Sequence, residues 1–272
     1  MERMDVERTN EDGGLPSSGW AGLRSVEASR PSEVDLERLD RMDAPELVRW
    51  AFETYGDRAA IGTSLQLSGA VLVDMAASTG LPFRVFTVDT LRLHPETYAA
   101  MDALERRYAI RLERYAPDPA KISRMVRDHG EYLFFDSRAK QEYCCQLRKV
   151  EPHARALQTL DVWLTGLRRD QSADRAQTRR AAWLEQDGRK ILKLAPLAHW
   201  TQEQVRHYVE ENNVPYNALY DQGYESIGCV ICTTPIRAGE DLRAGRWRWY
   251  NILEEASKKE CGIHVQGSGS GI

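Results

Sequence analysis

The chain has 272 residues and a formal net charge of −4, with 42% hydrophobic and 29% charged residues. This is an ordinary balance for a protein with a buried core, and the small charge gives no indication of a nucleic-acid or membrane-surface partner. No run of about 18 apolar residues is present in the sequence, so we expect no membrane-spanning helix. The acidic start lacks the apolar core of a signal peptide, and we therefore expect a cytoplasmic protein.

Composition divides the chain into three expected segments. Residues 1–30 contain glycine, serine and scattered charges without apolar periodicity, and we expect them to be disordered or loosely attached. Residues 31–250 are expected to form one α/β domain. Residues 251–272 are expected to form a mobile tail, whose glycine–serine end is typical of a linker.

Short apolar runs alternate with amphipathic stretches along the main domain. Two helices are expected between residues 32 and 55, with Ser32 as the cap of the first and Pro45 in the first turn of the second. The apolar runs predict strands at 59–62, 83–88, 110–115, 162–165 and 191–194. The amphipathic stretches predict helices at 69–77, 96–108, 119–129 and 201–212. The last helix begins with a capping box formed by Thr201 and Gln204. This alternation predicts a mostly parallel sheet flanked by helices on both faces.

Ligands of such sheets bind beyond the carboxyl ends of the strands. The loop 62–69 is expected there, with Ser64, Ser68 and Gly69 small enough to let backbone N–H groups approach a phosphate at a helix N-terminus. An ordinary strand-to-helix turn explains this loop equally well, because it has neither the Walker spacing nor a G-x-G-x-x-G pattern. A second loop, 89–94, carries His94, which we interpret as structural rather than catalytic.

The five cysteines form two close pairs and one single residue. Cys144 and Cys145 are adjacent, Cys229 and Cys232 form a C-x-x-C pair, and Cys261 stands alone. Structural disulfides are rare in a reducing cytoplasm, so the pairs predict a four-thiolate metal site with a separate reactive thiol. Taken by themselves, four thiolates slightly favour zinc, the commoner occupant, over an iron–sulfur cluster.

Positive charge gathers near the single cysteine. Two lysines and His264 lie close to Cys261 in the sequence, and neighbouring cations lower a thiol pKa and favour the thiolate. Further upstream, Arg243 and Arg246 suit a bidentate grip on sulfate or phosphate oxygens. Each feature alone also has a plainer interpretation, as an exposed thiol in a frayed tail and as a solvated basic face.

Taken together, these segments resemble the sulfonucleotide reductase family between residues 60 and 265. The motifs that carry the resemblance are TVDTLRLHPETY, CCQLRKVEP, WLTGLRRDQSADRA, SIGCVICTTPIRAGEDLRAGRWRW and KKECGIH. The resemblance implies an adenine-nucleotide α-hydrolase-like fold of the PP-loop type, in agreement with the parallel sheet. Gln66 and Leu67 stand where ATP-using members carry a glycine-rich SGGxDS pattern. This departure argues against ATP hydrolysis and for a loop that holds a nucleotide phosphate.

The paired cysteines are a feature of the iron–sulfur branch of this family, and the resemblance therefore replaces zinc by one [4Fe-4S] cluster per subunit. It implies adenylyl sulfate (APS) as substrate, because members that reduce the 3′-phosphorylated compound usually lack these four cysteines. The implied nucleophile is Cys261. The implied cluster ligands are Cys144, Cys145, Cys229 and Cys232. The expected substrate contacts are Lys149, Arg243, Arg246, His264, Ser64, Ser68 and Gly69, with Arg168 and Arg169 as weaker candidates.

The implied activity is thioredoxin-dependent reduction of APS to sulfite and AMP, through an S-sulfocysteine on Cys261, in assimilatory sulfate reduction. Thioredoxin is expected as a separate partner because the chain shows no thioredoxin-like domain. Alternatives are a 3′-phosphoadenylyl-sulfate (PAPS) reductase, an ATP-dependent adenylating or sulfurtransferase enzyme of the same fold, and a zinc-stabilised binding module. No nucleic-acid or membrane partner is expected, and a homo-oligomer is compatible with the sequence.

Overall fold

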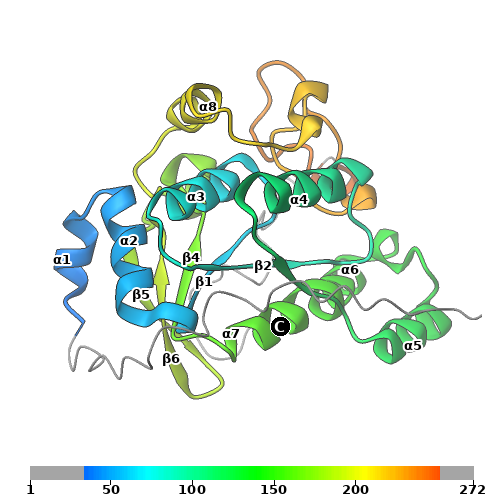
Figure 1. The fold of residues 1–272 in the computed structure, drawn as a ribbon. Coiled ribbons are helices and arrows are strands. Elements are labelled where there is room, and N and C mark those ends of the chain that lie inside the picture. The colour runs from blue at the N-terminus through cyan, green and yellow to red at the C-terminus, as the bar shows by residue number, and fades with distance from the viewer. Residues whose placement is uncertain (1–33, 252–272) are drawn as a thin grey trace, which may run out of the picture.

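Six strands form one sheet in the computed structural model, which describes residues 34–251 of the chain. The strands are β1 (Ala59–Gly62), β2 (Arg84–Val88), β3 (Leu112–Tyr115), β4 (Val162–Thr165), β5 (Ala181–Gln186) and β6 (Arg189–Leu194). Their order is β3-β2-β1-β4-β6-β5, and neighbouring strands are parallel except for the β5–β6 hairpin at one edge. The predicted mostly parallel sheet is therefore confirmed (Figure 1).

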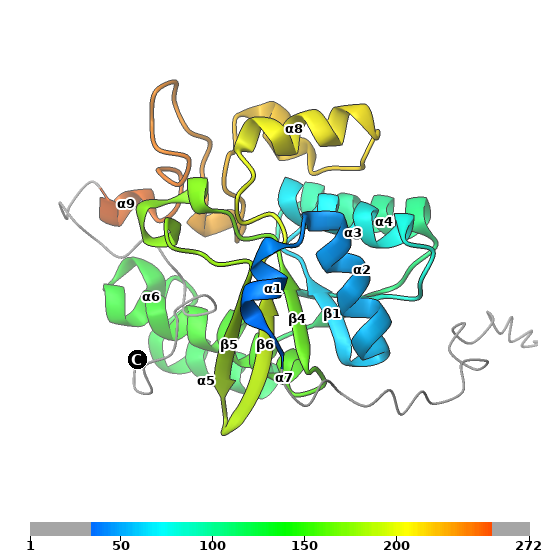
Figure 2. The ribbon, with the colours of Figure 1, turned by 90° about the vertical axis from the view of Figure 1, so that its left-hand side faces the viewer.

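Two layers of helices cover this sheet, as Figures 1 and 2 show. The helices of the described residues are α1 (Leu36–Arg41), α2 (Ala44–Tyr55), α3 (Leu67–Ser78), α4 (Pro95–Tyr108), α5 (Pro119–His129), α6 (Arg138–Cys145), α7 (Glu151–Leu157), α8 (Gln202–Glu211) and α9 (Arg248–Asn251). Helices α2, α3 and α4 lie on one face, with α8 outside α3, and α7 covers the other face. Among residues 34–251, no helix combines the length and the apolar character needed to cross a membrane.

Helix starts follow the predicted capping chemistry in two cases out of three. A capping box between Asp43 and Glu46 opens α2, with Pro45 in its first turn, and the predicted capping box of Thr201 opens α8. The prediction for α1 was wrong. Its cap is Asp35, whose carboxylate accepts a hydrogen bond from the Arg38 backbone N–H at 3.0 Å, whereas Ser32 lies outside the described residues.

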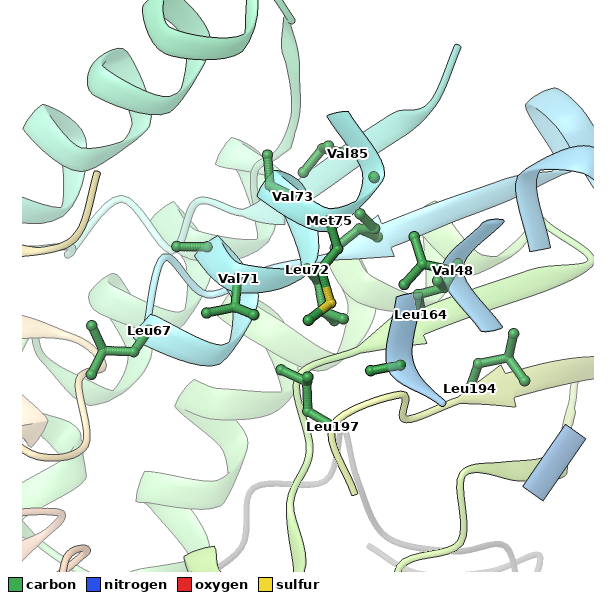
Figure 3. Close-up of a cluster of buried hydrophobic side chains, with 14 of the residues drawn as sticks. Val48, Leu67, Val71, Leu72, Val73, Met75, Val85, Leu164, Leu194 and Leu197 are labelled. Carbon is green, nitrogen blue, oxygen red and sulfur yellow. The ribbon is translucent and has the colours of Figure 1, made fainter. Parts of the chain in front are cut away.

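Alternate residues of each central strand pack into different layers. Ile61 of β1 and Leu164 of β4 face α2, α3 and α4, and belong to the large core cluster. Ala60 and Trp163, one position before them, belong to a second cluster with α7. Both faces of β1 and β4 are thus buried, as expected for the centre of a parallel sheet. Figure 3 shows the large cluster, where side chains of α3 converge with Val48 of α2 and with residues of β2, β4 and β6.

Helix α3 is buried on nearly all sides, because it lies between the sheet and the outer helix α8. Its apolar residues continue around the whole helix, a pattern typical of a buried helix rather than an amphipathic one. One carboxylate, Asp74, is buried on it. Asp74 accepts hydrogen bonds from Tyr108 of α4 at 2.9 Å and from Tyr208 of α8 at 2.7 Å, so its polar atoms are satisfied and the three helices are tied together.

The cysteine pair at the end of α6 is followed by an unusual backbone segment. Residues Gln146–Val150 form a π-helical turn that joins α6 to α7. Single π-turns of this kind are rare and are frequent at functional sites. Leu147, Arg148 and Lys149 within the turn are all buried, so the turn directs two cationic side chains into the protein.

Candidate functional site

The order in which strands are added to the sheet reverses between β1 and β4. A cleft opens beyond the carboxyl ends of these two strands. From β1 the chain proceeds to β2 on one side, whereas β4 and β6 follow on the other side. The loops after β1 and β4 approach each other closely, since a Cβ atom on Gly166 would lie 2.9 Å from Ser68 Cβ. Ligands of open α/β sheets bind at such switch points.

The loop after β1 has a tightly determined conformation. Leu65 adopts a positive φ of 58°, and its N–H donates to Thr63 Oγ1 at 3.0 Å. The N–H of Leu67 donates to the Tyr220 hydroxyl at 3.4 Å. The Gln66 side chain accepts a hydrogen bond from the Ile227 N–H at 3.2 Å. Gln66 therefore fastens the loop to the segment before the second cysteine pair, and two N–H groups of the loop already have internal partners.

Seven of the nine predicted substrate contacts line this cleft. Those that line it are Ser64, Ser68, Gly69, Lys149, Arg168, Arg243 and Arg246. Arg169 is exposed and turns away, with its Nε donating to the Thr178 carbonyl at 2.8 Å. His264 and the predicted nucleophile Cys261 lie outside the described residues.

The guanidinium of Arg168 is hydrogen-bonded to side chains within the protein. It is 2% exposed, and its Nε lies 2.9 Å from the Asp170 carboxylate. Its terminal nitrogens donate to the Ser68 hydroxyl and to the side-chain oxygen of Gln202. A buried guanidinium with this many partners serves chiefly to shape the cleft, since it holds Ser68 of α3 next to the loop after β4.

Two further arginines of the cleft lie side by side at Ser226. Arg243 and Arg246 are 8% and 6% exposed, and both direct NH1 toward the Ser226 hydroxyl, at 3.4 and 3.5 Å. A Cβ on Gly228 would lie 2.5 Å from Arg246 NH2, so the absence of a side chain at Gly228 makes room for the guanidinium. Buried paired cations at a cleft wall suit an anion with several oxygens.

Aromatic rings line the inner wall of the cleft. His153 of α7 stands edge-on to Trp163 with ring centroids 4.6 Å apart, and at 5.7 Å from the Phe86 ring. All three residues line the cleft. Burial, together with the nearby charge of Lys193, lowers the pKa of His153 to about 3. His153 is therefore neutral at physiological pH.

All four paired cysteines line one small cavity beside the cleft. Its wall contains Cys144 and Cys145 from the end of α6 and Cys229 and Cys232 from the later loop. Three cationic side chains line the same cavity, namely Arg92, Arg148 and Lys149. The two cysteine pairs therefore lie together in the fold. Lys149 and Cys229 also line the switch-point cleft, so they form a wall common to both spaces.

Backbone hydrogen bonds connect the second cysteine pair to the loop after β2 and to the segment before α9. The Val230 N–H, between the two cysteines, donates to the Arg92 carbonyl at 2.9 Å. The Cys232 carbonyl accepts from the Trp247 N–H at 3.1 Å. Thr90 links Cys229 to the π-turn after the first pair, since its hydroxyl lies 3.2 Å from Cys229 Sγ and its carbonyl accepts from Arg148 at 2.8 Å.

The thiols differ in acidity. Burial, with a contribution from Cys229, raises the pKa of Cys232 to about 11. Burial also raises the pKa of Cys144, although Arg148 and Arg92 oppose this effect. For Cys229, burial acts in the same direction, but the charge of Lys149 and the Thr90 hydroxyl outweigh it and hold the pKa below the usual range. The cations of the cavity therefore favour the thiolate form of Cys229 relative to an ordinary thiol.

The sulfurs share a cavity without forming a single-ion site. No group of three or more His, Cys, Asp or Glu side chains within residues 34–251 is arranged to hold a metal ion. A tetrahedral zinc ion needs four sulfurs within one coordination sphere, whereas a [4Fe-4S] cluster binds its four thiolates on separate irons. Four thiols beside three cationic side chains could hold an anionic metal centre of either kind.

Several residues of the site were not predicted from the sequence. The cleft also contains Gln171, Arg175, Gln202, Tyr220 and Ser226, and the cysteine cavity contains Arg148. Arg148 precedes Lys149 within the CCQLRK motif, so its position was a usable signal. His94 packs against Tyr224, with ring centroids 5.5 Å apart, and does not line the cleft, which agrees with a structural role.

The mostly parallel sheet and its switch-point cleft define an adenine-nucleotide-binding fold of the PP-loop type. The FMN adenylyltransferase of Candida glabrata shares this fold, with a TM-score of 0.50 at 14% identity, covering 74% of this chain and 64% of that one. Residues 58–235 match the phosphoadenosine phosphosulfate reductase domain. The chain belongs to this family, and the resemblance seen in the sequence is confirmed.

Individual relatives agree with this assignment. Adenosine 5′-phosphosulfate reductase of Allochromatium vinosum is 43% identical over 208 residues, which cover 76% of this chain and 79% of the relative. The protein of the same name from Burkholderia cepacia is 40% identical over 229 residues, covering 84% and 88%. Among solved structures, the phosphoadenylyl-sulfate reductase of Candida auris in its phosphate complex has a TM-score of 0.63 and 30% identity, covering 74% of this chain and 98% of that one.

Proposed function

We propose that this protein is an adenylyl-sulfate reductase, which converts APS to sulfite and AMP in assimilatory sulfate reduction with thioredoxin as the reductant. The observation that carries the proposal is the common wall formed by Lys149 and Cys229, between a nucleotide cleft and a cavity lined by four cysteines. Relatives of 40–43% identity that span most of the chain are named adenosine 5′-phosphosulfate reductase, and adenosine 5′-phosphosulfate is another name for APS.

The cationic end of the cleft is the proposed site for the phosphosulfate group. Lys149, Arg243 and Arg246 line it and are all under 10% exposed, so their charges act in a poorly screened environment. Two guanidinium groups beside one ammonium can share the oxygens of a doubly anionic group. Ser64, Ser68 and Gly69 at the start of α3 are the proposed contacts of the nucleotide, and His264 is a further proposed contact.

Cys261 is the proposed nucleophile. Its thiolate attacks the sulfur of APS, a bond forms between the two sulfur atoms, and the bond between that sulfur and the phosphate oxygen breaks. AMP leaves with the electron pair of the broken bond, and an S-sulfocysteine remains on the enzyme. AMP is a stable anion and needs little help from an acid. The cations of the cleft offset the charge on the transferred group.

Thioredoxin is proposed to complete the reaction. One thiolate of the reduced dithiol attacks Cys261 Sγ and displaces sulfite, which leaves with the electron pair of the sulfur–sulfur bond. The second thiol of thioredoxin then attacks the mixed disulfide and frees Cys261. The two electrons thus come from the dithiol, which becomes a disulfide. This partner, and the reduced cysteines, fit a protein of the cytoplasm.

We further propose that Cys144, Cys145, Cys229 and Cys232 hold one [4Fe-4S] cluster per subunit. Four thiolates in a cavity lined by Arg92, Arg148 and Lys149 suit an anionic cluster, since the cations offset its charge. When bound, the cluster would influence the cleft electrostatically, because the electrons for sulfite come from thioredoxin. Lys149 lies at the common wall and is the proposed link between the two sites.

An ATP-dependent activity is less well supported. The N–H groups of Leu65 and Leu67, in the loop that would cradle phosphates, are bonded to Thr63 and Tyr220. The glycine-rich SGGxDS pattern of ATP-using members is absent from residues 62–69. PAPS reduction is the closer alternative, and the names of the relatives favour APS.

Two measurements on anaerobically purified protein test the proposal. With reduced thioredoxin, sulfite formation should be much faster from APS than from PAPS at matched concentrations, and ATP should not be consumed. Metal analysis should give about four iron and four sulfide per chain, as a four-cysteine [4Fe-4S] site requires. Equal or reversed substrate preference would contradict the APS assignment, and stoichiometric zinc without iron would contradict the cluster.

A further inference from the structure

The four cysteines that line the cavity differ in exposure. Cys144, Cys229 and Cys232 are 7%, 5% and 8% exposed, whereas Cys145 is only half-buried. Oxidants and chelators reach the more exposed sulfur first, because thiolate reactivity follows exposure. The surroundings of Cys145 therefore matter most for the retention of a cluster.

The side chain of Gln141 meets Cys145 from one turn earlier on α6. Its Nε2 donates to Cys145 Sγ across 3.1 Å. Residues four positions apart lie on the same face of a helix, so this contact follows from the helix geometry. Gln141 is 7% exposed and lines the same cavity. Glutamine is usually exposed, and a buried amide directed at a sulfur atom is consistent with a specific task.

We propose that Gln141 is a positioning residue that retains the [4Fe-4S] cluster through an N–H···S hydrogen bond to Cys145. The inference rests on the proposed cluster. A donor on a ligating sulfur fixes the orientation of the ligand and withdraws electron density from the iron–sulfur bond. Arg92, Arg148 and Lys149 line the cavity as cations, whereas the amide of Gln141 donates a hydrogen bond without adding a charge.

The test compares three substitutions at this position with wild type. Gln141→Leu removes the donor, and Gln141→Glu replaces it by a carboxylate that repels the thiolate. With an iron chelator present, the absorbance of the cluster at about 400 nm should decay on the order of tenfold faster in Gln141→Leu than in wild type. Decay should be faster still in Gln141→Glu. Gln141→Asn keeps an amide on a shorter arm and should behave like Gln141→Leu.

Two further readouts separate hydrogen bonding from packing. In resonance Raman spectra, the iron–sulfur stretching frequencies should rise in Gln141→Leu, because the bond to Cys145 gains electron density. Ala139→Glu adds the same charge at an exposed position of α6 and should keep the wild-type decay rate. Equal decay rates and unchanged frequencies in wild type, Gln141→Leu and Gln141→Asn would overturn the inference and leave the cluster standing. Wild-type protein without iron would overturn both the inference and the proposed cluster.

Discussion

The guanidinium carbon of Arg246 lies 4.8 Å from the centroid of the Trp247 ring, although the two residues are neighbours in the chain. Trp247 makes this possible through a positive φ of 46°, which is uncommon outside glycine. Stacking on an indole ring is favourable for a guanidinium and restrains its orientation. Arg246 is thus held against Trp247, while Gly228 leaves space for its terminal nitrogens.

Gly228→Ala should impair catalysis without unfolding the protein. The added Cβ would lie 2.5 Å from Arg246 NH2, and the flexible guanidinium would move rather than the backbone. Loss of a hydrogen bond to a charged substrate group lowers kcat/KM for APS roughly tenfold or more. Steady-state kinetics with thioredoxin measures this loss, and the unfolding temperature should stay close to that of wild type.

A double-variant comparison identifies the cause of this loss. If Gly228→Ala acts by displacing Arg246, then adding it to Arg246→Ala should cause no further loss in kcat/KM. Fully additive effects of the two substitutions would show that Gly228 acts in another way.

Arg168→Met should destabilise the fold rather than only weaken substrate binding. The substitution leaves the Asp170 carboxylate without its guanidinium and removes the donor to Ser68. Breaking a largely buried charged network of this kind costs about 2–3 kcal/mol of unfolding free energy. Urea denaturation measures the effect. The matched control is Arg169→Met at the exposed neighbour, which should change stability by no more than about 0.5 kcal/mol.

His153 should contribute a measurable pH dependence of stability. Its pKa is about 3 in the folded protein and about 6.5 in an unfolded chain. Below pH 6.5 the unfolded state therefore binds a proton that the folded state does not, and stability falls as the pH falls toward 3. Between about pH 7 and pH 5 this group accounts for a loss of about 2 kcal/mol.

His153→Leu should remove this part of the pH dependence. Urea denaturation of wild type should show the loss between pH 7 and pH 5, and the variant should show a correspondingly flatter profile. Above pH 7 the two profiles should run parallel, because His153 is neutral in both states there. A variant as sensitive to acid as the wild type would show that other groups cause the dependence.

The sequence predicted the central sheet better than its edges and connections. The buried strands β1 and β4 have continuous apolar runs, and their predicted bounds agree with the structure. Strand β5 was missed because its residues are mixed in polarity, as an edge strand allows. The turn that joins it to β6 contained a usable signal, since Asp187 and Gly188 both adopt positive φ and Asp-Gly is typical of tight hairpins.

The helical segment between residues 138 and 157 was missed for a different reason. The π-turn at Gln146–Val150 interrupts the 3.6-residue period, so a search for helical periodicity fails across it. The same turn places Arg148 and Lys149 against the cysteine cavity. The π-turn that brings these two cations to the cavity therefore also hides the helical periodicity of the sequence around it.

At the candidate site, motifs made of residues close together in the sequence were predictable. Contacts between side chains that are distant in the sequence were not. The spacing of the two cysteine pairs is visible in the sequence and predicts that they act together. Arg168 was expected to contact substrate, but it is largely occupied by Ser68, Asp170 and Gln202. Ser68 and Gln202 come from the starts of α3 and α8, and only the packing of those helices shows that they converge on one guanidinium.

The last prediction is that Cys261 alone carries the covalent intermediate. The other four cysteines line the cavity beside the cleft, and as the proposed cluster ligands they would not be free to attack APS. Mixing wild-type protein with APS in the absence of thioredoxin should add about 80 Da, the mass of an SO₃ group, to the peptide that contains Cys261. Mass spectrometry of the digested protein locates the adduct.

Cys261→Ser should retain the cluster and bind APS, because neither requires this sulfur. It should release no sulfite, since a serine hydroxyl is a far poorer nucleophile and cannot form an S-sulfo adduct. Cys232→Ser is the informative comparison, because it should lose iron as well as activity. An adduct on another residue, or full activity of Cys261→Ser, would refute the mechanism while leaving the iron content of the site unaffected.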